Sequence, residues 1–110
     1  MCKTRVLSTR GATVLSSCAS CGVYYLWHQN LLLNFTEQAF KSFREVVNSL
    51  PFYKNSLPFP DGEERIVLHT PNDDICFAFD YDEFEEFKKA IDEAIFMTEV
   101  YELMNKQDNH

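Results

Sequence analysis

Cys18 and Cys21 are the residues whose type and spacing point most directly to chemistry. They lie three positions apart and are followed by Gly22. Two thiolates at this spacing, in a turn between two strands, can bind one metal ion, and zinc is the metal expected for such ligands. A glycine after the second cysteine lets the turn adopt a left-handed backbone. The pair therefore predicts one half of a zinc ribbon.

The other ligands of such a site are less well marked, because the chain has no second Cys-x-x-Cys. We expect Cys2 to be the third ligand, since it begins the strand predicted to pair with the strand that ends at Cys18. The weaker candidates are His28, His69 and Cys76.

Two other interpretations of the Cys18–Cys21 pair stay open. In a thiol-redox motif the first cysteine begins a helix, whose dipole lowers the pKa of the thiol. Residues 23–28 (VYYLWH) are β-branched and aromatic, which predicts a strand instead. The third interpretation is a pair of small thiols in a turn without a chemical role.

Composition excludes several classes of function. The chain has 110 residues, 17 acidic and 10 basic, with a formal net charge of −7. Nucleic-acid binding needs a basic face, so we expect no nucleic-acid partner. No apolar run approaches the roughly 18 residues of a membrane span. The basic start lacks an apolar segment after it, which predicts no secretory signal, a cytoplasmic location and reduced cysteines.

One feature of the first 36 residues allows another location. They contain no acidic residue, which is also typical of organellar transit peptides. The Cys-x-x-Cys and the strand-like stretches in the same segment favour a retained, folded portion.

Catalytic motifs are missing from the sequence. Three glycines are too few for a glycine-rich phosphate loop, and neither G-x-S-x-G nor H-E-x-x-H occurs. The acidic residues near the C-terminus fit the solvated face of a helix better than a carboxylate site; they are Asp82, Glu85, Glu86 and Glu93. We therefore expect no catalytic residue, and a binding protein rather than an enzyme.

The pattern of apolar residues and turns predicts six strands and two helices. The strands are expected at residues 2–9, 12–17, 23–28, 31–35, 65–70 and 75–79. The first helix follows Thr36 and ends before Pro51, and the second begins at Asp80. Residues 51–64, with three prolines, are expected to form a long loop.

Both helices have a marked beginning. Thr36 is a good N-cap, and Phe35 and Phe40 have the spacing of a hydrophobic staple. Asp80 and Glu83 fit a capping box, and Phe79 and Phe84 repeat the staple. The two sets are offset by 44 positions, which predicts an internal ββα repeat at residues 23–50 and 65–104 within a single domain covering residues 1–110.

These elements predict an α+β fold, an antiparallel sheet of about six strands in the order ββ-ββα-ββα with two helices packed on one face. Strand alternation then predicts that Leu31, Leu33, Phe35, Ile75, Phe77 and Phe79 face the helices. The opposite face carries Leu32, Asn34, Cys76 and Ala78. Because that face is also rather apolar, it needs another layer, from the N-terminal hairpin or from a second copy of the protein.

The loop at residues 51–64 holds four large apolar side chains, those of Phe52, Tyr53, Leu57 and Phe59. We expect these residues to close one edge of the core. Otherwise they form a flap that binds a partner or covers a small-ligand pocket.

Several segments together resemble a small family of uncharacterised bacterial proteins of about this length. They are SCASCG, FTEQAF, the turn TPND and FAFDYDEFEEF, and the similarity covers nearly the whole chain. The resemblance implies no activity. From the residues we expect a small soluble binding or interaction module with a protein partner, self-association being one form of it, and with zinc as a candidate cofactor. The alternatives are a thiol-redox protein using Cys18 and Cys21, and a small-ligand-binding domain.

Overall fold

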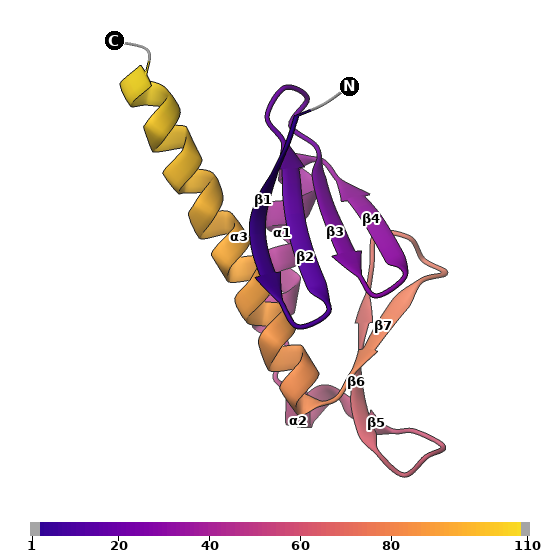
Figure 1. Ribbon diagram of the computed structural model, residues 1–110. Coiled ribbons are helices and arrows are strands. Elements are labelled where there is room, and N and C mark those ends of the chain that lie inside the picture. The colour runs from indigo at the N-terminus through magenta and orange to yellow at the C-terminus, as the bar shows by residue number, and fades with distance from the viewer. Residues whose placement is uncertain (1–2, 109–110) are drawn as a thin grey trace.

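The computed structural model describes residues 3–108 and the side chains of residues 3–105. Cys2 lies outside the described residues. The strands and helices follow in the order β1 (Thr4–Arg10), β2 (Thr13–Cys18), β3 (Tyr24–His28), β4 (Leu31–Phe35), α1 (Glu37–Ser49), α2 (Phe52–Asn55), β5 (Ser56–Pro58), β6 (Glu64–His69), β7 (Cys76–Phe79) and α3 (Tyr81–Asp108). The fold is α+β, as predicted (Figure 1).

The strands form two antiparallel sheets, so the prediction of one sheet of about six strands was wrong. One sheet has the order β1-β2-β3-β4 and the other the order β5-β6-β7. Instead of pairing, β4 and β7 border a cleft of about 450 Å³ whose lining includes Leu31 and Phe77. The His28 ring lies edge-on to Phe77 there, with 5.6 Å between ring centroids. This cleft and the rings beside it separate β4 from β7, so no ladder hydrogen bonds join the two sheets there.

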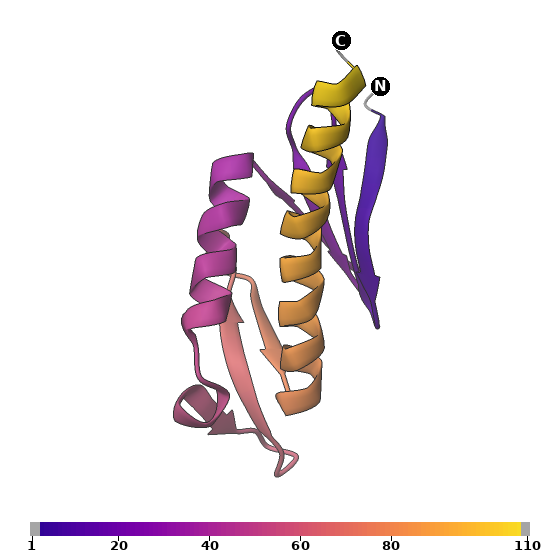
Figure 2. The same cartoon turned by 90° about the vertical axis from the view of Figure 1, so that its left-hand side faces the viewer.

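Both long helices lie on the same side of the four-stranded sheet (Figure 2). Helix α3 packs against β1 and β2, whereas α1 packs against β4 and α3. The three-stranded sheet lies beyond the end of the first sheet and contacts α3 through β6 and β7. The two predicted ββα units therefore belong to different sheets, and their common origin stays a prediction.

The predicted helix starts are confirmed. Thr36 accepts a hydrogen bond from the Ala39 amide at 3.1 Å. The Asp80 carboxylate accepts from the Glu83 amide at 2.8 Å, and the Glu83 carboxylate accepts from the Asp80 amide at 3.0 Å. The staple rings are 5.7 Å apart at Phe35–Phe40 and 6.4 Å apart at Phe79–Phe84. The hydrogen bonds satisfy N–H groups that every helix leaves open at its start, and the ring contacts fix the angle at which the chain enters the helix.

The predicted alternation of the strands is also confirmed. Phe35, Phe77 and Phe79 are buried, and Leu31, Leu33 and Ile75 are half-buried. The residues between them are exposed; they are Leu32, Asn34, Cys76 and Ala78. One cluster of buried apolar side chains draws on both sheets and both long helices.

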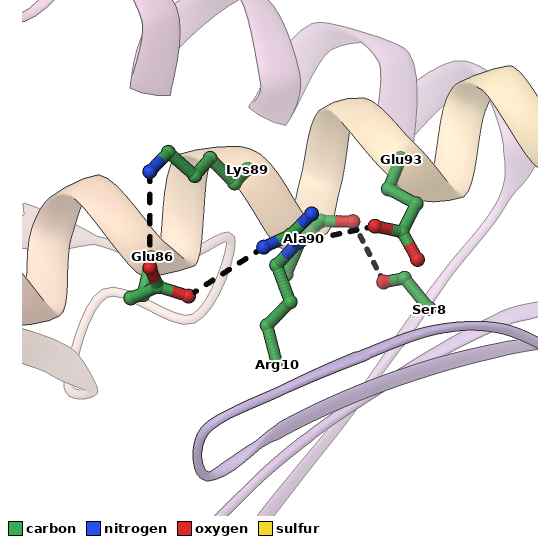
Figure 3. Close-up of polar contacts among 6 residues, drawn as sticks. All are labelled: Ser8, Arg10, Glu86, Lys89, Ala90 and Glu93. Carbon is green, nitrogen blue, oxygen red and sulfur yellow. Dashed lines mark hydrogen bonds and ion pairs between the residues drawn. The ribbon is translucent and has the colours of Figure 1, made fainter.

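A β-bulge in β1 fixes that strand to α3. The pairing with β2 shifts between Val6 and Ser8, so Leu7 and Ser8 are both buried. Ser8 Oγ donates a hydrogen bond of 2.7 Å to the Ala90 carbonyl oxygen. Arg10 lies 3.1 Å from Glu93 and 3.8 Å from Glu86 (Figure 3). The sequence pattern did not predict this anchor.

The segment expected to be a loop has structure of its own. Residues 51–64 contain α2 and β5, because Ser56–Pro58 pair with the beginning of β6. Of its four large apolar side chains only Phe52 is buried, and its ring contacts those of Tyr81 and Phe84. Phe59 is half-buried beneath the Arg65 guanidinium, whereas Tyr53 and Leu57 are exposed. The edge of the core is therefore closed by Phe52 alone among these four.

Candidate functional site

The face of the four-stranded sheet that points away from the helices carries several exposed apolar side chains. We call it the outer face; it comprises Thr4, Val6, Val14, Ser16, Tyr25, Trp27, Leu32 and Asn34. Val6 is 60% exposed, Trp27 53% and Leu32 59%. Val14, Trp27 and Leu32 pair across three strands and form one continuous apolar row. A groove of about 350 Å³ runs over this row.

The outer face carries no formally charged residue, although the chain has a net charge of −7. One of the two predicted cover layers is excluded, because the β1–β2 hairpin is part of this same sheet. Large apolar patches that stay exposed in this way mark binding surfaces more often than they serve stability.

The Cys-x-x-Cys turn has the backbone expected from its sequence. The Gly22 amide donates to the Cys18 carbonyl oxygen at 2.9 Å, and Gly22 has a φ of +71°. Cys18 ends β2 and is buried, whereas Cys21 is exposed. The turn leads into β3, so neither cysteine begins a helix, as the first cysteine of a thiol-redox motif would.

The structure separates this turn from the three weaker metal-ligand candidates. Cys18 lies beside the first residue of β3, whereas His28 ends that strand, roughly 15 Å further along. Cys76 borders the same cleft as His28, and His69 pairs with Cys76 in the other sheet. Within residues 3–108, no group of three or more His, Cys, Asp or Glu side chains is placed to hold a metal ion. A zinc site formed by Cys2, Cys18 and Cys21 stays a prediction.

A small polar cavity lies between this turn and α3. Its volume is about 150 Å³, and Cys18 is part of its wall. The Arg5 guanidinium lies over the Tyr101 ring at 4.7 Å, and the Tyr24 hydroxyl donates to Thr98 at 3.3 Å. These contacts tie α3 to the four-stranded sheet at the wall of the cavity.

The segment at residues 51–64 borders a second cleft. Tyr53 is 76% exposed, and its ring stacks on that of Tyr81 at 5.6 Å. The cleft measures about 480 Å³ and is lined by Phe52, Tyr53, Gly62, Glu63, Glu64, Asp80, Tyr81 and Asp82. The lining of this cleft is aromatic and acidic. Its use by a partner or a ligand stays a prediction.

His28 is a titratable residue whose environment the sequence pattern did not predict. From the sequence it was only a weaker metal-ligand candidate, but its ring is half-buried among those of Phe77, Phe79 and Phe87. Its Nδ1 atom is 2.8 Å from the Thr13 hydroxyl. Burial lowers the pKa of His28, and the nearby charge of Glu83 opposes this only in part. The phenylalanines lie more than 40 positions away in sequence, so no local signal could reveal this environment.

The lowered pKa of His28 predicts a pH-dependent stability. The unfolded chain, with a histidine pKa near 6.5, takes up the proton more readily than the folded chain. Stability is therefore complete above this pH and falls as the pH drops through 6.5 towards the folded-state value. We expect His28→Gln to lose less stability than the wild type between about pH 8 and about pH 5.

Urea unfolding of both proteins at the two pH values measures this difference. The hydrogen-bonded carboxylates Asp61 and Asp92 also have lowered pKa values, but they are present in both proteins and cancel in the comparison. An equal loss of stability in the two proteins would contradict the role of His28.

A second pair of metal-ligating side chains lies on the three-stranded sheet. His69 and Cys76 face each other across β6 and β7, with 3.2 Å between Nδ1 and Sγ. Both residues are exposed. From the sequence, each was only a weaker candidate for a metal site at Cys18, whereas the structure places the two side chains next to each other.

Comparison with known proteins gives a family but no activity. No curated protein and no solved structure matches the chain. In the described part of the chain, no helix has both the length and the apolar character needed to cross a bilayer. The model of the family of unknown function DUF6686 matches residues 1–109. This match covers nearly the whole sequence, so the chain belongs to the family of unknown function DUF6686.

Proposed function

We propose that this protein is a small interaction module that self-associates by packing the outer face of its four-stranded sheet onto that of a second copy. The observation that carries the proposal is the exposure of Trp27, which is 53% accessible at the centre of an apolar, uncharged row. We further propose that the module works in the cytoplasm, where its cysteines stay reduced.

The net charge of the chain disfavours self-association in general, and the outer face is the place where this repulsion is smallest. Two chains with a net charge of −7 repel each other, so they can approach closely only where charges are absent. The outer face is such a place, and two sheets can pack face to face about 10 Å apart. Its four strands span only about 20 Å in each direction. Since stable complexes bury about 800 Å² on each partner, we expect a dissociation constant in the micromolar range.

Sedimentation velocity between about 1 and about 500 μM tests this proposal. The wild type should pass from monomer to dimer as the concentration rises. Trp27 is the only tryptophan of the chain, so a blue shift of its fluorescence over the same range reports its burial. We expect Leu32→Glu to weaken the association at least about tenfold, because dimerisation would bury an unpaired charge.

Val46→Glu is the matched control. Val46 is 48% exposed and lies on α1, on the other side of the sheet. The same charge placed there should leave the dissociation constant unchanged. A wild type that stays monomeric over the whole range, or a Val46→Glu variant as weakened as Leu32→Glu, would overturn the proposal.

A further inference from the structure

We propose that His69 and Cys76 form one half of a zinc site that two copies of the protein complete. The two residues occupy paired positions on β6 and β7, and both side chains are exposed. This pair is independent of the Cys18–Cys21 turn and of the outer face.

The chemistry and spacing of the pair fit zinc. A thiolate and a neutral imidazole are among the ligands that zinc prefers, and the Nδ1 atom of histidine can serve as the ligand. With zinc–sulfur and zinc–nitrogen bonds of about 2.3 and 2.0 Å in a tetrahedral site, the two ligand atoms lie about 3.5 Å apart. The observed separation is 3.2 Å. A small rotation of either side chain increases the distance between Nδ1 and Sγ. The ion then takes the place of the thiol proton that lies between these two atoms.

The ligand count requires a second chain. In the described residues no third His, Cys, Asp or Glu side chain joins the pair to form a metal-binding group. Structural zinc takes four ligands, and two pairs related by a two-fold axis supply two sulfurs and two nitrogens. Strand β7 is at the edge of its sheet, and Cys76 is its first residue. Both side chains are exposed, so a second copy can approach the pair from solvent.

Charge also favours this arrangement. Two thiolates and one Zn²⁺ sum to zero, so the completed site adds no charge to chains that already repel each other. The metal thus links two acidic proteins through a site whose total charge is zero.

Titration of the metal-free, reduced protein with Co²⁺ and then Zn²⁺ tests the proposal. Cobalt bound to two thiolates in a tetrahedral site gives a thiolate charge-transfer band and intense visible absorption, which zinc then abolishes. We expect Cys76→Ser and His69→Gln each to remove about half a metal equivalent per chain from the wild-type value. Cys21→Ser, which removes a thiol of the other candidate site, should leave this half equivalent in place.

The same samples give the mass of the complex by sedimentation. In the Leu32→Glu variant, association through the outer face is weakened. Zinc should therefore double the mass measured for this variant, and a chelator should reverse the change. If the pair bound about one metal ion per chain and the mass of the protein did not change, the proposal that two chains share one site would be overturned. Unchanged binding by both Cys76→Ser and His69→Gln would overturn the site altogether. Because self-association through the outer face needs no metal, failure of either proposal leaves the other testable.

Discussion

Replacing Phe87 with alanine should lower the free energy of unfolding by about 3–5 kcal/mol. Phe87 is 1% exposed, and its ring meets those of Phe43 on α1 and of Phe77 and Phe79 on β7. It also packs edge-on against His28 of the four-stranded sheet. The alanine would leave a cavity where α3, α1 and both sheets meet. Each of these elements would lose contacts, and a shift of any one of them alone would not fill the cavity.

Urea or thermal unfolding measures this loss, and Phe96→Ala is the control. Phe96 lies on the same helix and is 62% exposed, so its truncation should change stability by no more than about 0.5 kcal/mol. A loss below about 2 kcal/mol for Phe87→Ala would show that this ring does not join the sheets as described.

Enlarging Ala90 to leucine should cost about 1–3 kcal/mol. Ala90 is completely buried, and its carbonyl oxygen accepts the hydrogen bond from Ser8. A side chain larger than a methyl group would push α3 away from β1, and the hydrogen bond and the ion pair between Arg10 and Glu93 would weaken together.

Lys89→Leu is the matched control for this substitution. It places the same side chain one position earlier, on the exposed side of α3, and gives up only a 3.8 Å ion pair with Glu86. We expect a change within about 0.5 kcal/mol, because exposed ion pairs contribute little. Equal stability of the two leucine variants would show that α3 does not need a small residue against β1.

The sequence predicted those parts of the fold that neighbouring residues determine. Thr36 with Phe35 and Phe40, and Asp80 with Glu83, marked both helix starts within a few positions, because caps and staples are local contacts. Strand alternation likewise placed Phe77 and Phe79 inside and Cys76 outside. The short α2 was missed, because four residues give too little periodicity to recognise.

The sequence could not predict features that depend on distant residues. The division into two sheets depends on His28 meeting phenylalanines from β7 and α3, and the anchor of β1 depends on Ser8 meeting Ala90. For the candidate sites, the sequence predicted an apolar sheet face in need of a cover, with Leu32 on it. It did not predict that His69 and Cys76 would be neighbours, because strand register fixes that pairing and the turn between them does not reveal it.

The extra residue in β1 determines which side chains of this strand face α3 before and after the bulge. Before the bulge Arg5 points towards the helix, and after it Arg10 does, although alternation alone would put these two residues on opposite sides. Tyr101, the partner of Arg5, is separated along the helix by about 12 Å from Glu93 and by about 22 Å from Glu86, the two partners of Arg10. A strand one residue shorter could keep one of these contacts but not both, so this single insertion lets one strand hold a long helix at two distant points.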